Sequence, residues 1–359
     1  MLKKLKRSRG GGSIFPIILM IIVTSVSILT IFMINLDTNL RSLQKDRYIK
    51  AVDMAVNTAM ANIELSDSVD DLNSNLNAQQ NEMGILYEAS SLDLLAAGYS
   101  VQKRIMVNKE ALMDTFYSTL LKNFQIKGLD KVASFQRYIP LKAILQYDTI
   151  SVSTGMHYDT SLGYNGFPKN KYVDDWQDIR LSFKVGTTDV FMTLGDECYT
   201  LIDPTAPMVA SVPAIPGEIL RFSDANKTKI DVTDPANNSV GGVQITPERK
   251  NEEMAMKVQS VLRAYANSPK LIKNELGVSS YYQNANKNVN YQMSIAEVDN
   301  VLHDKNTADK INGAINAAKD VTFYCLVEGL PMKSLLKGQI NNSFSTFSYG
   351  GAALKRADE

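Results

Sequence analysis

The sequence is poor in the residue types on which many enzyme active sites depend. Among 359 residues there are two cysteines, two histidines and one tryptophan. The histidines, His157 and His303, lie far apart in dissimilar settings, so we expect neither a catalytic role nor a metal site, and no cofactor. The HExxH, GxSxG, P-loop and GxGxxG patterns are all missing. The sequence therefore predicts a protein that is not an enzyme.

Two short acidic clusters are the remaining candidates for acid–base chemistry. They are Asp174-Asp175-Trp176 and Asp196-Glu197. Adjacent residues of a strand point to opposite faces, so neither pair of carboxylates is expected to converge on one site. We interpret both clusters as solvated turn residues.

The two cysteines, Cys198 and Cys325, leave two alternatives open. A disulfide between them would close a loop of more than a hundred residues, which the chain-entropy model values at up to ~4–5 kcal/mol. However, Cys325 lies in a strongly apolar run, where a free buried thiol behaves as a small hydrophobic side chain.

Charge is also missing from one long stretch near the start of the chain. No charged residue occurs between Gly10 and Leu36, and Ser13–Ile34 reads SIFPIILMIIVTSVSILTIFMI. As a helix, this core would span ~33 Å, enough to cross the ~30 Å hydrocarbon layer of a bilayer. The sequence predicts a transmembrane helix over residues 13–36.

The charges that flank this stretch predict its orientation. Five basic residues precede the first acid, Asp37, namely Lys3, Lys4, Lys6, Arg7 and Arg9. By the positive-inside rule, residues 1–12 form a cytoplasmic stub and the rest of the chain lies outside the membrane. That remainder has 33 basic against 38 acidic residues, which gives no electrostatic reason to bind nucleic acid.

Two kinds of processing compete with a permanent anchor. A cleaved secretory signal has a shorter apolar region, and the small residues Ser25-Val26-Ser27 fall in the middle of this one. Cleavage after Gly12 would resemble prepilin processing, although Ile17 stands where type IV pilins usually carry Glu. We favour an uncleaved anchor with membrane lipid as its partner.

Beyond the membrane, residues 37–65 are expected to continue as a helical stalk. Apolar side chains recur there at helical spacing: Leu40, Leu43, Ile49, Val52, Val56, Ala59 and Ile63. This stripe could pack on the protein's own outer domain, or against copies or partners in an assembly.

Residues 66–359 are expected to form an extracytoplasmic α+β domain with an antiparallel sheet. Expected helices are Met83–Ala97, Asn108–Phe124 and one from Thr246 to about Ala266, and expected strands lie in Leu141–Thr154, Ile179–Leu194, Glu218–Phe222, Val321–Pro331 and Phe344–Leu354. Ser66–Glu82 is interpreted as a linker and Gly155–Asp175 as a long loop, with helices and loops over Pro269–Ala318.

The N-terminal region resembles the TadE/TadG-like minor pilins of tight-adherence pilus systems. The matching features, over about 55 residues, are the basic stub, Arg9-Gly10, the uncharged helix and the Ala-rich amphipathic helix that follows. Membrane proteins of Gram-positive bacteria that accompany such systems are similar further on, at Phe116, Phe124, Pro140, Ala143, Tyr147 and Asp148, and over Glu328–Lys355.

This resemblance implies a structural or assembly component of a pilus-like or secretion apparatus, with other pilus or membrane subunits as partners. The alternative is a cell-surface enzyme or ligand-binding protein whose site would lie near His157, Asp174, Asp175 and Trp176.

Overall fold

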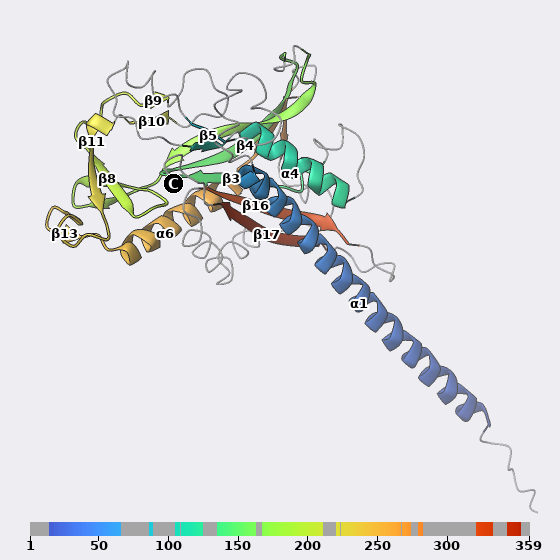
Figure 1. Cartoon of the computed structure of the whole chain (residues 1–359). Helices are drawn as coiled ribbons and strands as arrows, with labels where there is room; N and C mark the ends of the chain where they lie inside the picture. The colour runs from blue at the N-terminus through green and yellow to red at the C-terminus, as the bar shows by residue number, and fades with distance from the viewer. Residues whose placement is uncertain are drawn as a thin grey trace, which may run out of the picture. The chain divides into compact units, whose positions relative to one another are not determined.

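The computed structural model of the chain describes most elements of an α+β protein (Figure 1). The described residues are 14–65, 86–88, 105–107, 109–124, 135–162, 167–210, 220–222, 224–266, 268–273, 279–282, 321–332 and 343–352. The chain divides into two compact units, Met1–Tyr48 with Pro331–Ser343, and Ile49–Leu330 with Phe344–Glu359. The expected linker Ser66–Glu82, most of the helix Met83–Ala97, and His303 lie outside the described residues.

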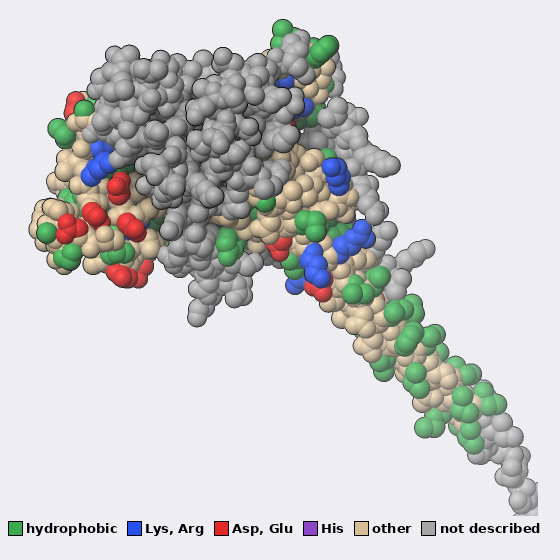
Figure 2. Space-filling model, in the orientation of Figure 1, with side chains coloured by type: hydrophobic (Ala, Val, Ile, Leu, Met, Phe, Trp, Pro, Cys, Tyr) green, Lys and Arg blue, Asp and Glu red, His purple; other side chains and the backbone are tan. Residues whose placement is uncertain are grey.

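The first unit contains the apolar part of a single long helix, α1, which extends over Ile14–Leu65. From Pro16 to Leu36 every side chain is exposed except that of Met33, which is half-buried, and most of these side chains are apolar, such as Met20 and Ile28. These side chains appear along the helix in Figure 2. The helix is long and apolar enough to be a single membrane span or a signal sequence.

Four hydroxyl groups of this helix form hydrogen bonds within it. Thr24, Ser27, Thr30 and Thr38 each donate to a backbone carbonyl one turn earlier, at 2.8–2.9 Å. Such back-bonding lets a hydroxyl sit in an apolar surrounding without an unpaired donor. At the end of the apolar stretch, Arg41 forms an ion pair with Asp37 one turn away.

The second unit is built on a seven-stranded sheet in the order β15-β14-β4-β3-β16-β17, with β5 also paired to β4. Its strands are β3 (Leu141–Gln146), β4 (Thr149–Asp159), β5 (Lys171–Arg180), β14 (Lys270–Lys273), β15 (Ser279–Tyr282), β16 (Val321–Pro331) and β17 (Ser343–Ala352). Most pairings are antiparallel, as expected, but β14 runs parallel to β4.

A smaller antiparallel sheet has the order β11-β8-β7-β6. Its strands are β6 (Ser182–Val185), β7 (Thr188–Met192), β8 (Glu197–Leu201) and β11 (Lys227–Asp231). Three two-stranded ribbons are formed by β1 (Leu86–Glu88) with β2 (Ile105–Val107), β9 (Val209–Ala210) with β10 (Leu220–Arg221), and β12 (Ser239–Val240) with β13 (Val243–Gln244). A 3-10 turn, η1 (Asp224–Asn226), precedes β11.

The helices of this unit cover opposite faces of the large sheet. Helix α6 (Pro247–Ala266) packs on β3, β4 and β6, and helix α4 (Lys109–Asn123) packs on β5. The C-terminal part of α1 lies on the α4 side, because Asn123 of α4 donates to the Ala51 carbonyl. The sheet is thus sandwiched between α6 on one face and α4 with the end of α1 on the other (Figure 1).

Alternation along the strands separates an apolar face from a polar one. Leu141, Ala143 and Leu145 of β3 join the apolar core under α6, whereas Lys142 between them points to the α4 side. All of these side chains are buried. Lys142 is therefore enclosed beneath α4 rather than exposed to solvent.

Several local signals in the sequence were read correctly. Helix α4 matches Asn108–Phe124, β16 matches Val321–Pro331, and α6 starts after Thr246, whose hydroxyl accepts from the Arg249 amide at 3.3 Å. Pro247 occupies the first turn, where its missing N–H costs little. Part of the expected stripe of the stalk helix packs on the second unit: Val52, Val56 and Ala59 are buried there, whereas Leu43 is 68% exposed.

Three expectations were wrong. The described part of the expected helix Met83–Ala97 is a strand, β1, which pairs with β2. Both ends of the expected loop Gly155–Asp175 are strand, because β4 continues to Asp159 and β5 begins at Lys171. Strands β14 and β15 replace helix or loop over part of Pro269–Ala318. In the last two places, long-range pairing with β4 supplies the backbone partners that the local sequence does not signal.

Candidate functional site

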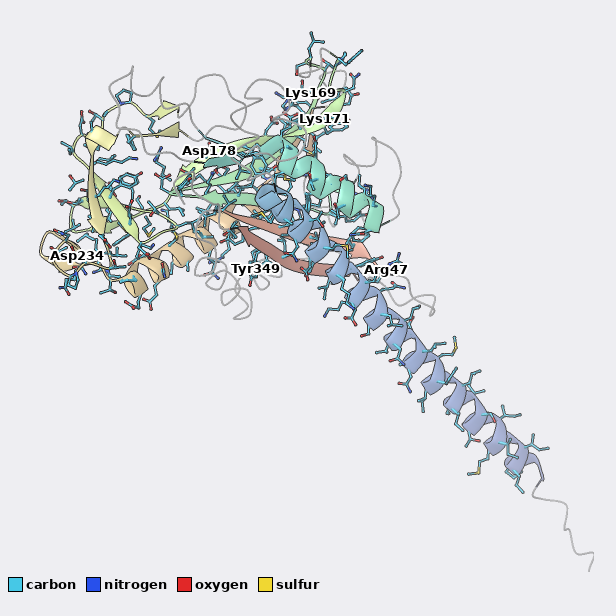
Figure 3. The ribbon with its side chains drawn as sticks, in the orientation of Figure 1. Arg47, Lys169, Lys171, Asp178, Asp234 and Tyr349 are labelled. Atoms are coloured by element: carbon cyan, nitrogen blue, oxygen red, sulfur yellow. The ribbon has the colours of Figure 1, made fainter. Side chains whose placement is uncertain are left out.

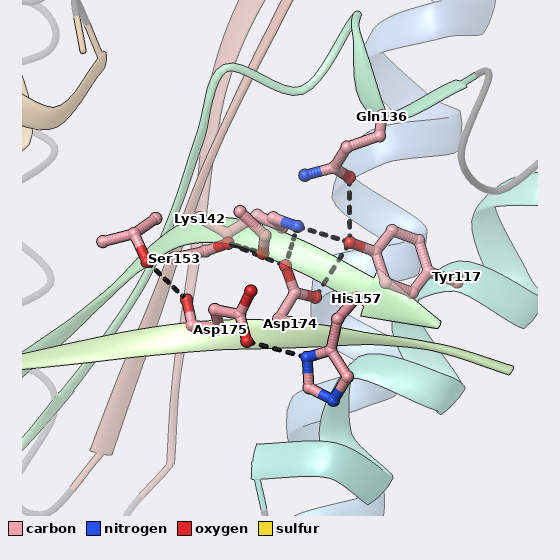
Figure 4. A network of polar contacts seen from close by, with 9 residues as sticks. Tyr117, Gln136, Lys142, Ser153, His157, Asp174 and Asp175 are labelled. Carbon is pink, nitrogen blue, oxygen red and sulfur yellow. Dashed lines mark hydrogen bonds and ion pairs between the residues drawn. The ribbon is translucent and has the colours of Figure 1, made fainter. Parts of the chain in front are cut away.

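A cluster of buried polar side chains lies between α4 and the large sheet (Figure 4). At its centre, Lys142 of β3 forms an ion pair with Asp174 of β5, and each side chain is only 1% exposed. The two strands flank β4, which contributes Ser153 to the same row. The Ser153 hydroxyl donates to Asp174 Oδ1 at 2.7 Å.

Helix α4 and the segment before β3 complete the cluster. The Tyr117 hydroxyl lies 3.0 Å from Asp174 Oδ2 and 3.0 Å from Gln136 Oε1, and it accepts a hydrogen bond from Lys142 Nζ. Tyr117 is held in place by Phe116, whose ring meets it edge-on and also packs on Phe323 of β16. The cluster is therefore enclosed by aromatic side chains.

Burial dominates the electrostatics of this cluster. It lowers the pKa of Lys142, an effect that the Asp174 carboxylate partly offsets. Burial likewise raises the pKa of Tyr117 well above its usual value, and the negative charge of Asp174 adds to the shift. The Tyr117 hydroxyl therefore keeps its proton at physiological pH and is able to donate it in a hydrogen bond.

A second buried lysine, Lys270 of β14, is close enough to interact with this pair. Its ammonium group donates to the Tyr265 carbonyl at 2.6 Å. Burial lowers the pKa of Lys270 to about 7, and repulsion from Lys142 adds to this.

Asp175 and His157 lie on the other side of β5. His157 Nδ1 is 2.7 Å from Asp175 Oδ1, and both side chains are 39% exposed. The pair forms because Asp175 is opposite Gly155 in the β4–β5 ladder and His157 is two residues further along β4. The carboxylate fixes the orientation of the imidazole ring, which leaves the other ring nitrogen free to point elsewhere.

Asp174 and Asp175, both candidates from the sequence, therefore belong to different clusters of side chains. Asp174 and Asp175 do point to opposite faces, as expected of neighbours on a strand, but the interpretation as solvated turn residues was wrong, because both lie within β5 and Asp174 is buried. It was right for Asp196 and Glu197, which are exposed beside and at the start of β8. Trp176 lies near Lys109 of α4, whose ammonium group is 5.8 Å from the ring centre.

Sequence reasoning missed Lys142, Ser153 and Tyr117 altogether. A lysine within the apolar run LKAIL was the available signal, because a lysine at a core-facing position of a buried strand requires a partner. Cys198 and Cys325, considered for a disulfide, are both free and buried, on strands of two different sheets.

Two further sets of polar contacts link different secondary-structure elements. At the tip of the β4–β5 hairpin, Lys169 forms ion pairs with Glu110 of α4 and with Asp159. Lys171 forms ion pairs with Glu110 and Asp114 of α4; both lysines are labelled in Figure 3.

Among the described residues, no group of three or more histidines, cysteines or carboxylates is arranged to hold a metal ion.

The second set of polar contacts joins the two sheets. Asp148, 1% exposed in the β3–β4 turn, accepts from Arg180 at 2.7 Å and from the Tyr199 hydroxyl of β8. Burial and the charge of Asp148 raise the pKa of Tyr199. These contacts hold β8 of the small sheet against β5 and the β3–β4 turn of the large sheet.

Comparison of the chain with protein-family models, with curated proteins and with solved structures finds no match.

Proposed function

We propose that this protein is a single-pass, membrane-anchored structural component whose second unit lies outside the cytoplasm, in a pilus-like or secretion assembly. The observation that carries the proposal is α1. Its apolar stretch is uncovered, and the hydroxyls of Thr24, Ser27 and Thr30 donate to carbonyls of the same helix, an arrangement suited to a lipid-facing segment.

The end of the same helix supports a permanent anchor. Val52, Val56 and Met60 are 0–3% exposed in the core of the second unit, and Asp53 accepts from Ser348 of β17 at 2.6 Å. Burying such side chains contributes about 1.5–3 kcal/mol each, so the helix end is part of the folded domain. A chain that kept its apolar segment would hold this domain at the membrane.

One face of the helix end remains open for other subunits. Met54 is 55% exposed, whereas Val52, Ala55 and Val56 near it in the sequence are buried. Further toward the membrane, Leu43 is 68% exposed. Apolar side chains left uncovered on an otherwise buried helix favour contact with another helix, from a second copy or a different subunit.

The anchor is tested by extracting membranes at alkaline pH and by treating intact cells with protease. We expect the full-length chain to stay in the membrane pellet and its second unit to be digested from outside. Recovery of the chain in the soluble fraction, or a mature form that lacks residues 14–36, would contradict the anchor.

The assembly role needs a separate experiment. A photo-crosslinking amino acid at position 54 should capture another subunit, whereas the same group at Lys229, exposed on β11, serves as the matched control. Surface appendages unchanged in number and function after deletion of the gene, with no adduct at position 54, would refute this role.

A further inference from the structure

The contact between Lys142 and Asp174 has the features of a reacting pair. The lysine nitrogen touches one oxygen of the carboxyl group, in a site where each side chain is 1% exposed. Because β3 and β5 lie on either side of β4, the pair spans three strands of the sheet. The nitrogen therefore already lies beside the carboxyl group whose carbon it would attack.

Both oxygens of the carboxyl group have a hydroxyl neighbour. Ser153 donates to Oδ1 at 2.7 Å, and Tyr117 lies 3.0 Å from Oδ2. Donors at these positions withdraw electron density from the carbon and stabilise the oxyanion that forms when a nucleophile adds to it. Gln136 fixes the position of Tyr117 through a contact of 3.0 Å.

Burial also favours the reactive protonation states. An amine attacks only when it is neutral, and desolvation lowers the pKa of Lys142 despite the opposing effect of Asp174. Transfer of one proton from the ammonium to the carboxylate converts a buried ion pair into a neutral amine and a neutral acid, which an apolar surrounding tolerates better. The titratable groups that interact with Lys142 are Asp174, Tyr117, Cys325, Asp175 and Lys270.

We propose that Lys142 and Asp174 condense into an intramolecular isopeptide bond. The bond from Lys142 Nζ to Asp174 Cγ forms and the bond from Cγ to the carboxyl hydroxyl breaks. One amine proton passes to the departing hydroxyl through Tyr117, and a water molecule leaves. The step is a condensation, so it requires no oxidant, reductant or metal. The product is an amide that ties β3 to β5 across β4.

A second lysine–aspartate pair beneath α4 provides an internal control. Lys109 Nζ lies 2.9 Å from Asp178 Oδ1, but the Asp178 side chain is 27% exposed. Ser151 and Lys109 both contact the same oxygen, Oδ1. Partial solvation stabilises the charged forms, so this pair stays an ion pair.

The experiment is mass spectrometry of the full chain purified from whole cells in detergent, denatured and digested with trypsin. The bond would block cleavage after Lys142 and join the peptide 138–169 to the peptide 172–180. After allowance for the substitution itself, intact wild-type protein should be about 18 Da lighter than K142R, the mass of the lost water. The variant K109R should keep the deficit.

The wild-type digest decides the question even if K142R fails to fold. A branched peptide with the mass deficit supports the bond. Separate peptides, with complete cleavage after Lys142 and no deficit, would overturn it. The outcome is independent of the membrane anchor and of the assembly partners, because the reacting groups all lie within the second unit.

Discussion

Gly155 offers the most direct test of how the large sheet is assembled. It lies in β4 at a register shift between Ser153 and Gly155, where β14 approaches in parallel. A Cβ atom built on Gly155 would lie 2.0 Å from the carbonyl oxygen of Leu271. That oxygen belongs to the backbone, so β14 itself would have to move away from β4.

The loss of folding stability in Gly155→Ala can be worked out from the contacts that β14 would lose. The parallel ladder joins three pairs of residues, and each hydrogen bond has a net worth of ~1 kcal/mol. Ile272, 4% exposed, would lose part of the ~2 kcal/mol that its burial contributes. We expect the variant to be destabilised by about 3–4 kcal/mol if the strand detaches completely.

Hydrogen exchange of the full chain in detergent, read by mass spectrometry, locates the damage. Amides of β14 and β15 should exchange faster in Gly155→Ala, while those of β6 and β7 should keep their rates. Gly195→Ala is the matched control, because a Cβ there meets no atom within 4 Å. Unchanged protection of β14 in Gly155→Ala, or equal loss in both variants, would refute the close approach.

Four further outcomes are expected. Phe116→Ala should lower the free energy of unfolding by about 3–5 kcal/mol in urea titrations, since the ring is fully buried, whereas the exposed Met256→Ala should have little effect. Tyr199→Phe should cost about 1–2 kcal/mol in the same assay by leaving Asp148 with one donor fewer. Because burial lowers the pKa of Lys270 to about 7 from ~10.4 in the unfolded chain, the unfolded state binds more protons between these values, so wild type should gain stability relative to Lys270→Met from pH 7 to pH 10. Burial raises the pKa of Cys198 and of Cys325 to about 12, so iodoacetamide at pH 8 should label neither in the folded protein and both after denaturation without reductant; a count of zero would indicate a disulfide.

The elements that the sequence predicted well are those with a local signature. Helix α6 has a capping Thr246, Pro247 in the first turn and an apolar stripe, and β16 is a continuous apolar run. The turn of the β6–β7 hairpin contains Gly186 with φ of 61°, a conformation that glycine adopts without strain. In these places the conformational preference of the residues and the burial of their side chains favour the same secondary structure.

The candidate site was not predictable in the same way. Lys142, Ser153 and Asp174 are brought into one row by the register of three strands and by the irregularity at Gly155, neither of which leaves a local pattern. Tyr117 comes from a helix packed over the row. The Asp174-Asp175 pair was noticed, but a run of Gly, Asn and Pro nearby suggested a loop where long-range pairing produces strands.

The contact between Asp53 and Ser348 joins residues that are 295 positions apart in the chain. Gly350 beside it leaves room for Val56 and Met60, whose side-chain atoms would lie 2.9–3.0 Å from a Cβ at that position. During synthesis, the apolar side chains of Val56 and Met60 therefore stay uncovered until β17 has been made. A nascent chain that is stalled earlier would expose this helix end to chaperones and proteases.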